Sequence, residues 1–169
     1  MKSFFTITLS VLIAVVLIMT QGLRAQRNKL NSLLYQVNLL TCISIAFNLV
    51  SIISIQEKDI VFFQGMYYAS STWLLIAFYR FVICYTDSRL SAYHFSLLFL
   101  TASMFDTFSF IINVHDHHAF TTSDMVWFDQ MTYHIFHTHT SYFHLHLILS
   151  YLIAALTLAV LIESVVNAK

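Results

Sequence analysis

Polar side chains recur at helical spacing along one apolar stretch, residues 93–114. Steps of three or four residues place five of them on one helical face: Ser103, Asp106, Ser109, Asn113 and, just beyond the stretch, His117. Asp106 is the one carboxylate well inside an apolar stretch, and an ionisable group in hydrocarbon is costly unless it faces a partner or a cavity. The pattern indicates either an interhelical hydrogen-bond seam, with Asp106 protonated or paired, or a polar pocket that opens outward.

A matching polar face occurs on the stretch 60–85. Gln64, Tyr68 and Ser71 follow one another at helical spacing in its outer half, at a depth comparable with that of Asp106. We therefore expect Asp106 to face the helix bundle with a polar neighbour from this group. The candidate sensing or ligand-binding residues are Asp106, Ser109, Asn113, Gln64, Tyr68 and Ser71.

Histidine is unusually frequent, because the chain has nine and eight of them lie between His115 and His146. The first interpretation is polar lining of the membrane interface. The second is pH sensing, since free histidine changes charge near neutrality. The third is binding of zinc, another transition metal or haem, since imidazole suits zinc, copper and iron. No spacing matches a structural zinc motif, so no cofactor is expected, and the candidate ligands in the metal-binding alternative are His117, His118, His137 and His144.

The elements that carry these residues are predicted by the lengths of the apolar stretches. Of 169 residues, 59% are hydrophobic and only 9% are charged, against about 25% charged residues in soluble domains. Five stretches approach the roughly 20 apolar residues that span a bilayer. They are residues 4–21, 33–55, 60–85, 93–114 and 142–162. Runs this long predict helices, because the strands of membrane barrels alternate and are about half as long.

The predicted fold class is therefore an all-α polytopic membrane helix bundle of about five transmembrane helices, forming a single domain. An outer histidine-rich loop is expected over residues 115–141. The basic residues Arg24, Arg27 and Lys29 directly follow the first stretch, which favours a retained helix over a cleaved signal peptide.

Orientation is predicted from the basic residues of the connections. Arg24, Arg27 and Lys29 follow the first stretch and Arg89 follows the third, whereas the expected outer loop has no Lys or Arg. We therefore expect an N-terminus outside and a C-terminus inside. The expected location is the cell membrane, as a multi-pass protein of the plasma or bacterial inner membrane.

Several function classes lack support in the sequence. The formal net charge is zero, so no nucleic-acid partner is expected. The motifs HExxH, GxSxG and CxxC do not occur, and we expect no enzymatic activity; a dyad of Asp106 with a nearby histidine is the residual catalytic alternative. The chain has no Pro, and Gly65 lies close to a helix end, which argues against a transporter with broken helices.

Two stretches resemble a known family. Phe62–Leu75, with the sequence FFQGMYYASSTWLL and then Tyr85-Thr86, resembles the third helix of the seven-helix N-terminal region of histidine kinases. Residues 106–113 with 117–120 resemble that family's fourth helix and outer loop. Similar regions also precede diguanylate cyclase domains. The resemblance covers roughly residues 30–163 and implies a membrane sensor that drives a cytoplasmic enzyme domain.

The sequence departs from that family because it has five apolar stretches and no kinase or cyclase domain. It is either a fragment or a stand-alone relative. We therefore expect a membrane-embedded sensory or signal-input module without its own output domain. Its expected partners are the lipid bilayer and either a second copy, as a homodimer, or a separate cytoplasmic kinase or cyclase. The alternative is a metal- or haem-binding membrane protein that uses the outer histidine cluster.

Overall fold

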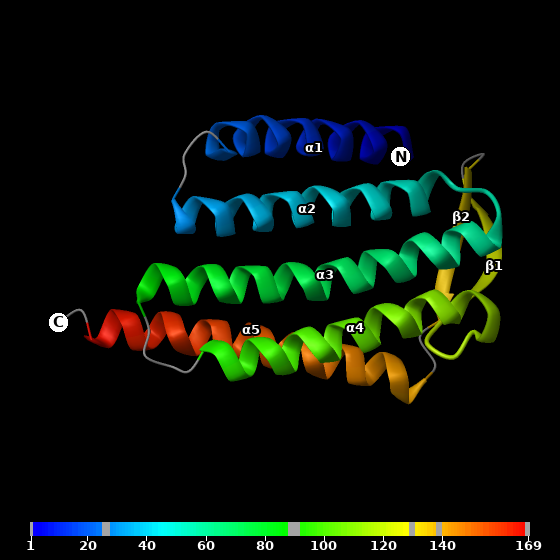
Figure 1. Ribbon diagram of the computed structural model, residues 1–169. Helices are drawn as coiled ribbons and strands as arrows, with labels where there is room; N and C mark the ends of the chain where they lie inside the picture. The colour runs from blue at the N-terminus through cyan, green and yellow to red at the C-terminus, as the bar shows by residue number, and fades with distance from the viewer. Residues whose placement is uncertain (1, 25–27, 88–91, 129–130, 138–139, 168–169) are drawn as a thin grey trace.

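The computed structural model is a bundle of helices with one two-stranded hairpin (Figure 1). It describes the chain except for residues 1, 25–27, 88–91, 129–130, 138–139 and 168–169. Its elements are α1 (Lys2–Arg24), α2 (Lys29–Ile53), α3 (Glu57–Thr86), α4 (Ala92–Asp116), β1 (Thr121–Phe128), β2 (Met131–His137) and α5 (Ser141–Asn167). The predicted helix bundle is confirmed.

Four helices are long and apolar enough to cross a membrane by length and composition: α2, α3, the part of α4 from Leu97 to Asp116, and α5. In α1 the apolar segment that can be assessed, Thr6–Gln21, is shorter. Large apolar side chains such as Leu145, Ile148 and Leu152 are exposed on α5, which suits a surface that faces lipid tails rather than water. The chain is a multi-pass membrane protein.

Helix α3 is the centre of the bundle, because α2, α4 and α5 all pack against it, while α1 packs against α2 (Figure 1). Its contact with α4 is close at Gly65. A Cβ added there would lie 3.2 Å from both the Cβ and the carbonyl oxygen of Phe110. Small residues allow such close helix approaches in membranes, so Gly65 fixes where α4 lies on α3.

The segment 115–141 is not the loop that the sequence analysis expected. Helix α4 continues to Asp116, and β1 and β2 form an antiparallel hairpin in which Thr121 pairs with His137 and Phe128 with Met131. The register is irregular between Ser123 and Met125. The prediction was wrong here because it followed the histidines and overlooked the β-branched and aromatic residues that favour strands.

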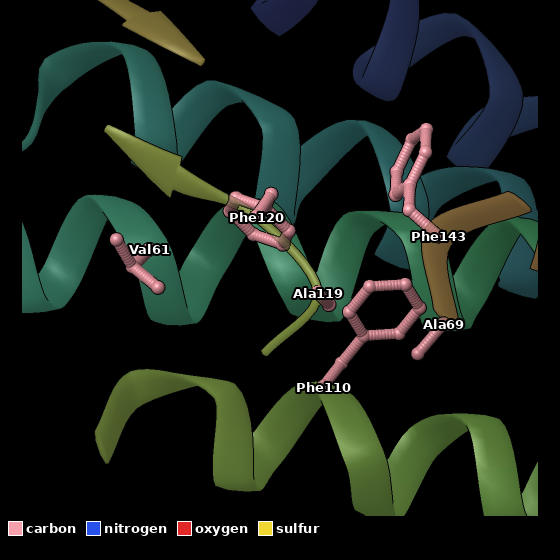
Figure 2. Packing of buried hydrophobic residues seen from close by; sticks show 6 residues of the cluster. All are labelled: Val61, Ala69, Phe110, Ala119, Phe120 and Phe143. Atoms are coloured by element: carbon pink, nitrogen blue, oxygen red, sulfur yellow. The ribbon is translucent and has the colours of Figure 1, made fainter. Parts of the chain in front are cut away.

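Two apolar clusters fill the bundle, one near the hairpin and one toward the opposite end. The hairpin-end cluster contains Val61, Ala69, Phe110, Ala119, Phe120 and Phe143. Figure 2 shows its members coming from α3, from α4, from the turn after α4 and from α5. The opposite-end cluster contains Ile76, Tyr79, Val82, Phe99, Ile153 and Val160. The candidate site lies between these two clusters.

Candidate functional site

Four polar side chains form a buried layer between the two apolar clusters. We call Thr72, Asp106, Tyr142 and His146 the polar layer. Nδ1 of His146 lies 2.8 Å from Oδ2 of Asp106, and the Thr72 hydroxyl donates to the same oxygen at 3.2 Å. The Tyr142 hydroxyl donates to Oδ1 of Asp106 at 2.8 Å. Asp106 is 3% exposed and His146 4%, so the carboxylate is removed from solvent and held by donors from two other helices.

Helix periodicity explains why these residues meet. Tyr142 and His146 are four residues apart on α5 and share a face. Thr72 lies on α3 between Ala69 and Ile76, which belong to the two apolar clusters. The layer is therefore a polar crosslink of α3, α4 and α5 at a level where the neighbouring turns are apolar.

The hydrogen-bond pattern assigns protons within the layer. Both carboxylate oxygens of Asp106 accept hydrogen bonds from hydroxyl groups, which suits an ionised carboxylate, an acceptor only. Nδ1 of His146 is then the donor toward Oδ2. This leaves Nε2 of the ring, which has no hydrogen-bond partner among the described residues. The ring can be neutral or, with a proton on Nε2, an imidazolium that balances the carboxylate charge.

Aromatic rings enclose His146. The centroid of its ring lies 5.0 Å from that of Phe110 in an edge-on arrangement, 5.7 Å from that of Tyr68 and 5.8 Å from that of Phe143. Because these rings flank the imidazole and only 4% of His146 is exposed, charge interactions there are stronger than in water. A change in the charge of His146 therefore alters its interactions with side chains of α3, α4 and α5.

A short turn closes the hairpin side of the layer. We call residues 117–120 the strap. Oδ1 of Asn113 accepts hydrogen bonds from the amides of Ala119 at 2.7 Å and Phe120 at 3.2 Å, and its Nδ2 donates to the Phe120 carbonyl at 3.1 Å. The Thr140 hydroxyl donates to the carbonyl of Ala119 at 3.2 Å. The strap thereby places the buried Phe120 ring against Tyr68, with centroids 5.6 Å apart.

The expectation that Asp106 faces the bundle is confirmed by its burial. Its hydrogen-bond partners are Thr72, Tyr142 and His146, and none of the residues expected nearby (Gln64, Tyr68 and Ser71) hydrogen-bonds it among the described residues. Gln64 accepts instead from Ser51 at 3.1 Å, and the Ser71 hydroxyl donates to the Tyr68 carbonyl at 2.6 Å. Tyr68 packs against His146 and makes no hydrogen bond to Asp106 in the described part of the chain.

Ser109 and Asn113, the other two predicted site residues on α4, have different surroundings from each other. Ser109 is buried next to the Tyr142 hydroxyl. Asn113 is fully buried and holds the strap, so its role is to position the turn over the layer. Ser109 is thus brought to the layer, whereas Asn113 supports it from one turn away.

Sequence reasoning missed Thr72, Tyr142 and His146 as members of the site. His146 was grouped with the outer histidines, although it is buried while His115, His117 and His144 are exposed. One signal could have found it: Tyr142 and His146 lie one helical turn apart at the start of a long apolar helix. Two polar rings on one turn of such a helix suggest a partner inside the bundle.

The predicted metal ligands do not converge in the part of the chain that is described. His118 is half-buried with its ring 5.3 Å from that of Tyr142, and Nδ1 of the exposed His144 lies 3.0 Å from the Thr140 carbonyl. The side chain of His137 lies outside the described residues. No group of three or more His, Cys, Asp or Glu side chains that could hold a metal occurs among the described residues. The geometry of the described residues therefore does not support the metal- or haem-binding alternative.

Comparisons with protein-family models, with curated proteins and with solved structures each found no match. The resemblance to the histidine kinase N-terminal region therefore stays an interpretation of the residues.

Proposed function

We propose that this protein is a membrane-embedded signal-input module whose state is read by a cytoplasmic output enzyme. The observation that carries the proposal is the buried pair of Asp106 and His146, which joins α4 to α5 at 2.8 Å. Ionisable residues inside membrane helices are rare, face the bundle interior and mark sites of function.

A contribution to folding stability does not by itself explain why the protein contains this buried ion pair. Replacing a buried ion pair by well-packed apolar residues is often neutral or stabilising. The pair also joins two helices that share few close backbone contacts. Helices α4 and α5 both pack on α3, and the side chains of the polar layer connect them by hydrogen bonds. A side-chain crosslink of this kind can have two arrangements, which is what a switching element requires.

Enzymatic and transport functions have weaker support. Aspartate and histidine at hydrogen-bond distance occur in catalytic dyads, but catalysis by such a dyad also needs a nucleophile within reach of the other ring nitrogen. Among the described residues nothing hydrogen-bonds that nitrogen. The apolar clusters on both sides of the layer give no polar path across the bundle within the described residues.

The partners of the proposed module are the bilayer and a cytoplasmic kinase or cyclase, with a homodimer as a further proposed state. The sequence has an excess of basic residues in the connections after α1 and α3, which favours a cytoplasmic location for both. The proposed compartment is the plasma or bacterial inner membrane.

Reporter fusions test this orientation. Fusions after Asn28 and Ser88 should read cytoplasmic, and fusions after Lys58 and Ser123 should read external, because basic connections are retained inside. Alkaline phosphatase and green fluorescent protein fusions give opposite readouts for the two sides and control each other. An external reading after Asn28 would reverse the proposed orientation.

The signalling proposal is tested in the cell that carries the gene. Deletion should change the level of cyclic dinucleotides or the phosphorylation of response regulators, and a wild-type copy should restore it. A copy with Asp106→Asn should fail to restore it, because the variant loses the charge that holds His146.

The matched control is Asp116→Asn, which removes an exposed carboxylate from the end of the same helix. This variant should restore the output as well as wild type. Membrane fractions should contain both variants at the wild-type level. Full restoration by Asp106→Asn at that level would rule out the polar layer as the responding element.

A further inference from the structure

We propose that the stimulus is the proton, bound at Nε2 of His146 with Asp106 as its fixed counter-ion. The signalling role of this proton rests on the proposed function, whereas the binding itself can be measured on the isolated protein. The proposal concerns a buried histidine of α5 and not the exposed histidines of the outer segment.

The net charge of this site depends on whether His146 carries a proton at Nε2. With a proton on Nε2 the pair of Asp106 and His146 is neutral overall, and without it the layer holds a buried negative charge. The Thr72 and Tyr142 hydroxyls donate to the carboxylate, but as neutral groups they do not balance its charge. Burying an uncompensated charge is costly, so proton occupancy and helix packing are linked.

Few other ionisable groups face the pair. From α3 the Tyr68 ring packs on His146, from α5 Tyr142 binds Asp106, and from the strap His118 packs on Tyr142. The sequence has no Lys or Arg between Lys58 and Arg80, or between Arg89 and Lys169. Histidine is therefore the only cation that α4, α5 and the adjoining part of α3 can supply to Asp106.

Two buried hydroxyls lie about one helical turn from the pair, on the side away from the hairpin. The hydroxyl oxygens of Ser103 and Ser150 are the buried side-chain atoms without a hydrogen-bond partner among the described residues. Ser103 precedes Asp106 by three residues, and Ser150 follows His146 by four. Since α4 and α5 run in opposite directions (Figure 1), both steps lead the same way along the bundle.

Neither serine hydrogen-bonds His146 in this structure. A serine hydroxyl one turn away can reach a ring nitrogen only after a change of rotamer, and it can then accept from a protonated nitrogen or donate to a bare one. One further turn along each helix, Phe99 and Ile153 belong to the opposite-end cluster. The pair and the two serines therefore lie on the hairpin side of the opposite-end cluster.

This arrangement predicts the direction of the switch. At low pH, the neutral pair holds α4 and α5 together. As the pH rises, His146 loses its proton, the layer gains a net negative charge, and the contact between the two helices loosens. The strap over Tyr68 and Phe120 is the part of the bundle nearest to this change.

The experiment uses the full chain in lipid nanodiscs. Nitrogen-15 spectra of labelled histidines follow the protonation state of His146 across the pH range in which the protein stays folded. Spin labels at Ile111→Cys on α4 and Leu145→Cys on α5, both exposed positions, report the distance between the helices after Cys42→Ala and Cys84→Ala. We expect His146 to pass between two protonation states and the label distance to follow the same pH curve.

The controls separate the possible failures. His146→Gln should abolish the distance change, and His115→Gln, at an exposed histidine on α4, should retain it. A wild-type His146 that does not titrate, or titrates with no change in label distance, would overturn the proposal without any variant having to fold. Proton flux in liposomes that is lost in His146→Gln would overturn it in favour of conduction. If His146 titrates and the helices move while the deletion experiment shows no change in output, the proton site stands and the proposed signalling function falls.

Discussion

Asp106→Leu is expected to lower the free energy of unfolding by about 3–5 kcal/mol, the cost of removing one partner of a buried ion pair. The substitution removes the carboxylate that accepts from Nδ1 of His146 and from the hydroxyls of Thr72 and Tyr142. The two hydroxyls keep only longer hydrogen bonds to backbone carbonyls, at 3.4 and 3.3 Å. Insertion should be intact, since leucine is far more favourable than aspartate in a membrane helix. Thermal unfolding can be followed with a thiol-reactive dye, because Cys42 is buried and Cys84 is half-buried.

The double variant Asp106→Leu with His146→Phe tests whether this loss comes from breaking the buried pair. Much of the lost stability should return, because replacing both partners by apolar groups leaves no unpaired ring nitrogen beside the new side chain. The difference between the double variant and the sum of the two single variants measures the coupling of the pair. A loss below about 1 kcal/mol for Asp106→Leu would be typical of a solvated surface pair, and would contradict the closed polar layer.

Asn113→Ala should open the strap. The substitution removes the acceptor of the Ala119 and Phe120 amides and the donor to the Phe120 carbonyl. A buried polar group left unpaired costs about 1–3 kcal/mol, which corresponds to about 5- to 150-fold in an opening equilibrium. Hydrogen exchange at the amides of Ala119 and Phe120 should accelerate by a factor in this range.

Thr140→Val is the matched control for the strap. It removes a single hydrogen bond, the one from the Thr140 hydroxyl to the Ala119 carbonyl. Its effect on exchange at Ala119 and Phe120 should be smaller than that of Asn113→Ala. Unchanged exchange at both amides in Asn113→Ala would show that the strap is held by the packing of the Phe120 ring and not by the asparagine.

The sequence was sufficient for those features that depend on one segment at a time. Apolar length predicted the helices, since a bilayer requires about 20 such residues in each. The cost of a carboxylate in hydrocarbon predicted that Asp106 faces inward, and it is 3% exposed. The hairpin at Thr121–His137 was also within reach of the sequence, because its β-branched and aromatic residues are a local signal.

The partners of Asp106 were decided by the tertiary structure. Ser71 and Thr72 are adjacent in the sequence, yet Thr72 donates to Asp106 and Ser71 to a carbonyl of its own helix. Neighbouring residues point about 100° apart on a helix, so a small rotation of α3 about its axis selects one or the other. Spacing shows which residues share a face, but not how far each helix is turned or shifted against its neighbours. The close approach at Gly65 and the layer that joins Asp106 to His146 set that rotation and shift, and both exist only once the helices have packed.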